Sequence, residues 1–449
     1  MPRYLGWYLL HHGLNAVFFM LTFGSSVFVL FLDDLGLGKD RIGLILSLFP
    51  FCGLVAPLIS GAVTRFGLKR TYITFYGIRK FVMLLMLLAP WVLDRYGSSI
   101  LFVYITGVLL VFALCRATAE TAYYPWSREF IPDAVRGWVG GQTNVVVSLT
   151  SALAMLLASL VLARGSGYGR YQLLIGIASF LGVISVVAMV RVPAGSLPVS
   201  GSASRHGLTL QPALSDRRFR GFLIGVMLGI AGVAGYPFIP LLARERLLIP
   251  EAQVVLFDVA NTVGALASSL YWGWAADRYG GKPLTLVTLG IVGLLPWVWL
   301  LLPPGTGITL AGGLLLAFLY GVASIGLGIA SYRWFLNDIV PMEGRTTYTS
   351  IWYAGSGLAG GLAPFIAGWI LRACGTLEWQ GGILQVHAFT VLFAVTTAIT
   401  FAAVVCYRRV LAEADFRVHD YVRATVREDL PRFLRWVAGP ILRKSPVRR

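Results

Sequence analysis

Two acidic side chains, Glu120 and Asp258, fall inside long apolar stretches of the sequence. Arg116 precedes Glu120 by four residues and Asn261 follows Asp258 by three, so each acid shares a helical face with a polar partner. An acid at such a position is typical of sites that bind a cation, a substrate amine or a proton. The alternatives are a structural ion pair near a wet helix end for Glu120 and a hydrogen bond to a neighbouring helix for Asp258.

Three amide side chains form a second group of candidates. Asn15 lies in the first apolar stretch, and Gln142 and Asn144 lie in the fifth. Together they could form a polar patch that binds a solute. Amides inside apolar helices also serve as hydrogen bonds between helices, and this second interpretation stays open.

Other polar and aromatic side chains in the apolar stretches have more ordinary interpretations. We expect His11 to lie at the membrane surface, and Arg79 and Lys80 to extend toward that surface from the third stretch. Tyr236 and Tyr320 could line the wall of a binding cavity, although packing is the commoner role of aromatic side chains in spanning helices.

The composition indicates which elements must position these side chains. Of 449 residues, 57% are apolar and 13% are charged, and the mean hydropathy is +0.75. Soluble domains have about 45–50% apolar and about 25% charged residues, so a soluble enzyme, a nucleic-acid-binding domain and a disordered protein are excluded. A spanning helix needs about 20 apolar residues. The sequence therefore predicts an all-α polytopic membrane protein.

The apolar stretches predict twelve transmembrane helices in two pseudo-symmetric six-helix bundles, residues 1–192 and 219–407. Residues 193–218 are rich in Gly, Ser and Pro and predict a cytoplasmic linker. The tail, 408–449, is basic and amphipathic, so we expect it on the anionic inner leaflet. The expected helices are 8–32, 42–63, 72–93, 98–125, 137–163, 170–191, 219–242, 251–275, 284–303, 307–335, 346–371 and 383–407.

Orientation follows from the positive-inside rule. When the N-terminus is placed in the cytoplasm, most Lys and Arg residues outside the apolar stretches fall on the cytoplasmic side, which predicts a plasma (inner) membrane protein with both termini inside. The net charge of +17 therefore requires no nucleic-acid partner.

Four scattered cysteines without a CxxC pair indicate no metal site, and we expect a monomer without a cofactor.

Two loop motifs recur in the two halves. A loop after the second expected helix matches one after the eighth when Gly67 is aligned with Gly280, and a loop after the fourth matches one after the tenth when Pro132 is aligned with Pro341. The nearly equal offsets indicate a duplicated six-helix unit, which is typical of transporters that bind substrate between their halves. The loop residues concerned are Arg65, Gly67, Arg70, Pro132, Arg136, Gly273, Asp277, Arg278, Gly280, Lys282, Pro341 and Arg345.

The segment from Gly273 to Lys282 resembles the signature loop of the major facilitator superfamily, G-x-x-x-D-R-x-G-x-[RK]. The resemblance covers about residues 1–407. It implies a secondary transporter, not an enzyme, that moves a small organic solute by alternating access and that could be coupled to protons. Export of amphipathic compounds or drugs stays open as an alternative, and so does a non-transporting sensor. A membrane-embedded transferase would need an acid-rich or long loop, and the sequence offers none.

The resemblance also implies a gate. In the family the loop acid pairs with an Arg at the inner end of a helix, which here matches Asp277 with Arg333, beside the N-terminus of the helix expected at 137–163. The equivalent positions in the first half are Thr64 and Tyr124, so both charges are present in one half and absent in the other. An unpaired charge at an inner gate is costly, which supports the pairing. Such a pair would stabilise the state closed to the cytoplasm.

Overall fold

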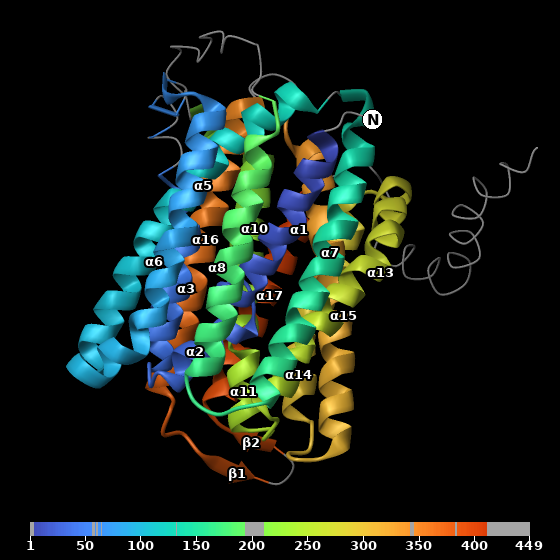
Figure 1. The fold of residues 1–449 in the computed structure, drawn as a ribbon. Helices are drawn as coiled ribbons and strands as arrows, with labels where there is room; N and C mark the ends of the chain where they lie inside the picture. The colour runs from blue at the N-terminus through green and yellow to red at the C-terminus, as the bar shows by residue number, and fades with distance from the viewer. Residues whose placement is uncertain are drawn as a thin grey trace, which may run out of the picture.

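The computed structural model describes residues 4–55, 59, 62–63, 65–131, 133–193, 211–341, 345–381 and 384–410. The chain forms a bundle of helices that run lengthwise between two ends (Figure 1). We call the end at which residues 193 and 211 flank the linker the linker end. The opposite end, which carries a short β-hairpin, is the hairpin end.

The first half begins with a helix that is broken after about two thirds of its length. It consists of α1 (Tyr4–Thr22), α2 (Ser26–Asp34), α3 (Lys39–Gly53), α5 (Leu68–Leu84), the 3-10 turn η1 (Leu85–Leu88), α6 (Ala89–Phe130), α7 (Asp133–Ala163) and α8 (Gly169–Val190).

The second half repeats this plan after a short helix that leads out of the linker. It consists of α9 (Gln211–Ser215), α10 (Arg217–Gly232), the 3-10 turn η2 (Tyr236–Phe238), α11 (Ile239–Glu245), α12 (Glu251–Val254), α13 (Leu256–Tyr279), α14 (Gly281–Leu300), α15 (Gly307–Trp334), the π-helical turn η3 (Phe335–Ile339), α16 (Arg345–Ala373), strands β1 (Trp379–Gly381) and β2 (Leu384–Val386), and α17 (Ala388–Arg409).

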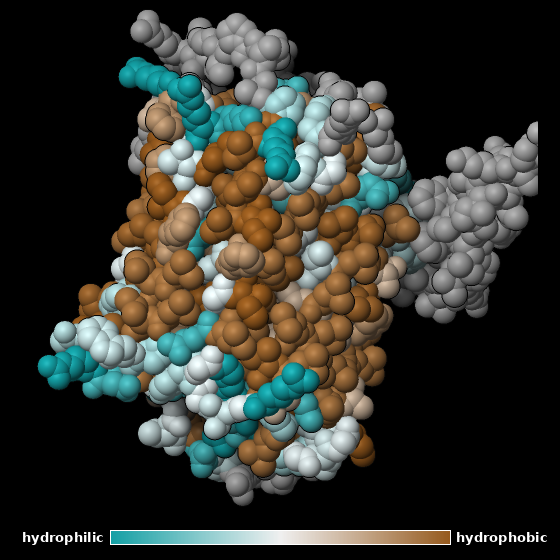
Figure 2. Space-filling model, in the orientation of Figure 1, coloured by the Kyte–Doolittle hydropathy of each residue, from teal (hydrophilic) through white to brown (hydrophobic). Residues whose placement is uncertain are grey.

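The hydropathy of the chain explains this architecture. Ten helical stretches among the described residues are long and apolar enough to cross a membrane. One of them, Leu68–Ser127, holds two of the expected spans, because Gly97 has a φ of 79° and breaks α6. The described part of α3 accounts for another expected span. Figure 2 shows the resulting apolar belt between hydrophilic surfaces at the two ends.

The duplication is visible in the backbone. The first helix of each half is interrupted at an equivalent place, after Thr22 in one half and after Gly232 in the other. The two aligned loop glycines, Gly67 and Gly280, both have a positive φ, 97° and 80°. A side chain is strained in that region of φ/ψ space, so the glycines that align in sequence share one backbone requirement.

Several expected boundaries differ from the structure. Strand β2 occupies the beginning of the helix expected at 383–407, which starts instead at Ala388, after an extended His387. The hairpin was not foreseen, because each strand has only three residues. Helix α9 lies in the last part of the expected linker. Residues 194–210, the tail from 411, Thr64 and Pro132 lie outside the described residues.

Candidate functional site

Asp258 joins the two halves of the bundle. It lies in the first turn of α13, and its carboxylate Oδ2 accepts hydrogen bonds from the backbone N–H (3.0 Å) and the side-chain hydroxyl of Ser26. Ser26 is the first residue of α2, so the carboxylate also meets the positive end of that helix. The contact spans 232 residues of sequence and holds an acid of the second half against the first.

A cavity of about 80 Å³ opens beside this contact. Asp258 and Asn261 both line it, as their shared helical face predicts. Tyr236 and Tyr320 form part of the wall with their rings stacked at 3.8 Å, and the Tyr236 hydroxyl donates to the carbonyl of Val292 at 2.7 Å. The cavity therefore combines one carboxylate and one amide with aromatic walls.

Two glycines allow the helices around this cavity to approach closely. A Cβ on Gly321 of α15 would lie 2.0 Å from the carbonyl oxygen of Asn261, and one on Gly264 of α13 would lie 2.2 Å from that of Phe318. Backbone atoms at these distances cannot yield by rotamer changes. The glycines therefore position Asn261 beside the cavity.

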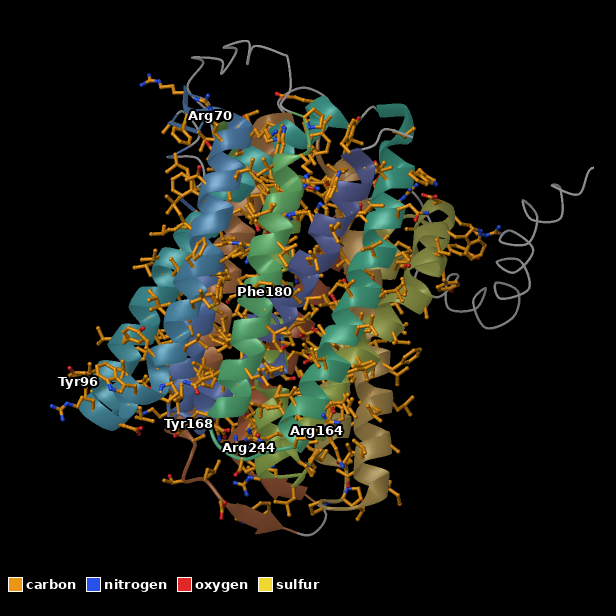
Figure 3. The ribbon with its side chains drawn as sticks, viewed as in Figure 1. Arg70, Tyr96, Arg164, Tyr168, Phe180 and Arg244 are labelled. Carbon is orange, nitrogen blue, oxygen red and sulfur yellow. The ribbon has the colours of Figure 1, made fainter. Side chains whose placement is uncertain are left out.

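A network of ion pairs crosses between the halves at the hairpin end. Arg170 of α8 pairs with Asp34 of α2 and with Glu251 of α12. Arg244 of α11 pairs with Asp34 at 2.5 Å and with Asp33 at 3.2 Å. Figure 3 places Arg244 at the hairpin end and Arg70 at the linker end. The sequence motifs do not predict this network, although the adjacent acids Asp33 and Asp34 are a signal for it.

Two further ion pairs join the halves at the same end. Lys39 pairs with Glu245 at 2.6 Å, and Arg372 pairs with Asp40. His387 lies beside them, only 7% exposed. Burial lowers the pKa of His387 below its usual value of 6.5, and the positive charges of Arg246 and Lys39 lower it further, whereas Glu378 raises it. The hairpin end is therefore closed by contacts that depend on charge.

Helices α3 and α16 cross between the halves with almost no space between their backbones. A Cβ on Gly43 would lie 2.3 Å from the carbonyl oxygen of Pro364, and one on Gly368 would lie 2.3 Å from that of Lys39. The helices belong to different halves, so this close crossing is a second element that closes the hairpin end.

Arg116 and Glu120 form the ion pair that their spacing allows. Arg116 Nε lies 2.7 Å from Glu120 Oε1, and the two side chains are 33% and 41% exposed. Both lie on α6, toward the linker end. The structure thus brings together the two residues of this candidate, and its part in transport stays a prediction.

The three candidate amides do not form a common patch. Asn15 Oδ1 accepts hydrogen bonds from Arg79 (3.0 Å) and Lys80 (2.8 Å), both on α5. Gln142 and Asn144 are exposed on α7. The amide of Asn15 therefore serves as a contact between helices of one half.

Three side chains that were expected at the membrane surface are buried instead. His11 and Lys80 are 0% exposed, and Arg79 is 2% exposed. The Tyr72 hydroxyl and the carbonyl of Ser185 both lie within hydrogen-bond distance of the His11 ring, at 2.7 and 2.8 Å. Arg79 and Lys80 do not extend to the surface, because α5 turns this face toward α1 and not toward lipid.

The repeated loops at the linker end hold their lysines in the same way. Lys69 donates to the carbonyls of Val190 (2.9 Å) and Val192, at the end of α8. Lys282 donates to the carbonyls of Arg408 (3.3 Å) and Val410, at the end of α17. Each lysine satisfies carbonyls that have no partner within the helix.

The expected gate pair is formed. Arg333 donates to Asp277 Oδ1 at the linker end, and their side chains are 34% and 71% exposed. Both residues belong to the second half, so the pair alone does not distinguish an open from a closed gate. Its role in gating stays a prediction.

The remaining loop residues have less specific surroundings. Arg278 donates to the hydroxyl of Tyr279 at 3.1 Å. A Cβ on Gly273 would meet nothing within 4 Å. Arg65, Arg70 and Pro341 are exposed, and the side chains of Arg136 and Arg345 lie outside the described residues.

The second half of the chain matches a known family model. Residues 221–418 match the model described as Major Facilitator Superfamily. No curated protein matches the chain in sequence.

Solved structures resemble the chain over nearly its whole length. The nucleoside transporter NupG superposes with a TM-score of 0.67 at 14% identity, covering 91% of this chain and 99% of that one. A D-xylose–proton symporter gives a TM-score of 0.67 at 14% identity, covering 92% and 99%. A bacterial homologue of the iron transporter ferroportin in an inward-facing state gives 0.65 at 14% identity, covering 91% and 98%. At these identities the likeness concerns the fold.

Proposed function

We propose that the chain is a secondary transporter of the major facilitator superfamily, not an enzyme, and that it moves a small organic solute by alternating access, coupled to protons through Asp258. The family model matched by residues 221–418 and the shared fold support this proposal. The halves would rock against each other along the seams formed by α3 with α16 and α7 with α13, and these seams would part at the hairpin end when it opens. We also propose that the linker end faces the cytoplasm, because the Lys and Arg residues outside the spans concentrate there.

The contact between Asp258 and Ser26 is the observation that carries this proposal. It lies at the hairpin end, between the halves and at the edge of a cavity. Opening the hairpin end would separate α2 from α13 and break both hydrogen bonds. The same acid would then be free to exchange a proton with the outside solution.

The chemistry of the contact makes it sensitive to protonation. An ionised carboxylate accepts strongly from an N–H, from a hydroxyl and from the positive end of α2. A protonated Asp258 loses the charge that these donors stabilise. Protonation therefore favours the state in which the hairpin end is open, and deprotonation favours the closed state.

The cavity supplies the polar and aromatic groups that a small solute needs. Aromatic walls with a few oriented polar groups are typical of small-molecule sites. In this structure the cavity is small, so we propose that the solute also contacts the partly exposed Arg116 and Glu120 when the halves rearrange.

A transport assay in proteoliposomes tests the proposal. The solutes would be nucleosides and D-xylose, which the names of two similar structures suggest, together with dipeptides, dicarboxylates and phosphate. We expect one class to accumulate, and a proton gradient to raise that accumulation. Asp258→Asn should abolish the effect of the gradient, because the amide carries no titratable proton.

Solute exchange across an equilibrated membrane provides the control. Exchange needs the rocking motion but no net proton movement, so Asp258→Asn should retain it. The control Glu378→Gln, a change in the segment directly before strand β1, should behave as the wild type. If no solute moves in either assay, the transport proposal fails and a sensor is indicated. If Asp258→Asn accumulates solute normally under the gradient, Asp258 is not the coupling group.

A further inference from the structure

Two buried cations in the first half form no ion pair with an acid in the part of the chain that the structure describes. Arg79 and Lys80 are 2% and 0% exposed, on a helix whose first residue, Leu68, is at the linker end. At about 1.5 Å per residue they lie about 16 Å along α5, near the middle of a hydrocarbon core about 30 Å thick. Charges at this depth are costly to keep and usually mark function.

The groups around the pair do not neutralise it. Both side chains donate to one neutral acceptor, Asn15 Oδ1, and the buried Nε of Arg79 has no partner. The guanidinium carbon of Arg79 lies 3.5 Å above the ring of Tyr76, and Lys80 Nζ lies 3.4 Å above that of Phe18. Aromatic faces stabilise a cation but leave its charge in place.

A layer of phenylalanine rings separates this pair from a third cation. Arg79 lies 5.5 Å from the ring of Phe112, which contacts Phe23 at 4.8 Å. Arg116 lies 6.0 Å from Phe23 on the other side of the layer and is 33% exposed. Glu120 pairs with Arg116 at 2.7 Å, so this third cation has a counter-charge of its own.

We propose that the transported solute is an anion, with a carboxylate or phosphate group whose charge Arg79 and Lys80 select. This inference rests on the proposed transport function and names its substrate class. The unpaired Arg79 Nε can bind the anion directly if the phenylalanine layer opens. Contact is not required. The attraction between the solute's anionic group and one of these cations about 10 Å away, at an effective dielectric of about 20, strengthens solute binding by roughly tenfold.

The negative charge of Asp258 is compatible with an anionic solute. Asp258 belongs to the second half, and its carboxylate is held against the first half by two donors of Ser26 and the positive end of α2, so its charge is offset locally. A proton carried on Asp258 would moreover compensate the charge of an anion during transport.

Thermal unfolding of the purified protein tests the charge of the ligand. The midpoint would be measured with sodium salts of acetate, succinate, citrate, phosphate and glycerol phosphate, against sodium chloride of equal ionic strength. Choline chloride, D-xylose and uridine serve as cationic and uncharged controls. We expect at least one carboxylate or phosphate to raise the midpoint by several degrees, because a ligand that binds only the folded state stabilises it. The responding salts distinguish carboxylate from phosphate.

Variants show whether the response depends on the buried pair. Arg79→Gln and Lys80→Gln should each weaken the binding of that anion roughly tenfold, whereas Lys80→Arg and the exposed control Arg164→Gln should preserve it. Each variant is compared with its own chloride midpoint, so a change in basal stability does not affect the result.

Two sets of results would overturn the inference. One is that no tested anion shifts the wild type beyond chloride, or that choline or an uncharged solute does so instead. The other is an equal anion response in Arg79→Gln and Lys80→Gln. If an anion binds through Arg79 and Lys80 but no tested solute is transported, the transport function is contradicted and only the anion site stands. Transport of uncharged solutes alone would support the transport function and contradict the anion inference.

Discussion

Replacing Gly43 with Ala should open the hairpin end. Gly43 lies where α3 crosses α16, and both helices close that end between the halves. The added Cβ would stand 2.3 Å from the carbonyl oxygen of Pro364 and 3.1 Å from the Cα of Gly368. Ordinary van der Waals contact begins at 3.4 Å, so the two backbones must separate by roughly 1 Å in the closed state.

The magnitude follows from the cost of overpacking. An extra methyl group in a tightly packed interface costs about 1–3 kcal/mol. The strain is confined to the state in which α3 and α16 touch, because separated halves leave room for the methyl group. The equilibrium should therefore shift toward the open state by about 5- to 150-fold.

Labelling of a cysteine at the hairpin end measures this shift. Ser159 of α7 donates to the carbonyl of Ala252 in the other half at 2.6 Å, so Ser159→Cys is covered when the end is closed. In a background with the native cysteines replaced, its rate of reaction with a maleimide reports the open fraction. The matched control is Gly53→Ala on the same helix, where a Cβ meets nothing within 4 Å.

The two glycine substitutions should differ in their effect on labelling. Gly43→Ala should raise the labelling rate at least fivefold above that of Gly53→Ala. Equal rates in the two variants would show that the crossing of α3 and α16 does not hold the hairpin end closed.

Three further predictions concern the charged groups at both ends. Arg244→Gln should raise labelling of Ser159→Cys about fivefold at low salt, because partly exposed ion pairs contribute about 1 kcal/mol; high salt should bring the wild type toward the variant. Lys69→Met and Lys282→Met should each lower the free energy of unfolding by about 0.3–1 kcal/mol, measured by thermal unfolding, because each lysine caps a helix C-terminus. Burial lowers the pKa of His387, so the unfolded chain binds protons more readily than the folded chain below about pH 6.5. Stability should therefore fall as the pH drops from 7 to 5, and the fall should be smaller in His387→Gln.

The fold could be predicted from the sequence to a large extent, because membrane insertion depends on local properties. Apolar length predicts the spans, and the repeated loops predict the duplication that Gly67 and Gly280 display in their backbone angles. The three-residue strands of the hairpin leave no periodic signal of their own.

For the candidate site, the sequence could predict only the neighbours that lie on the same helix. Asp258 and Asn261 lie three residues apart, so their common cavity follows from helical spacing. Ser26, the partner of Asp258, lies 232 residues away. Nothing in a single sequence connects two such residues, since their contact depends on how the halves pack.

The environment of Arg79 and Lys80 could not be predicted from the sequence for a different reason. Long basic side chains in peripheral helices usually reach the membrane surface, and that general tendency predicted the wrong environment here. Their burial depends on which face of α5 is turned toward Asn15, and that face is set by how α5 packs against α1.

The central claim is that solute movement is coupled to protons through Asp258. A pH-sensitive dye enclosed in proteoliposomes reports proton movement directly when the solute found in the transport assay is added outside. We predict a change in internal pH that accompanies transport by the wild type and is absent in Asp258→Asn, which still exchanges solute. Solute accumulation without a change in internal pH, or an equal pH change in Asp258→Asn, would contradict the account.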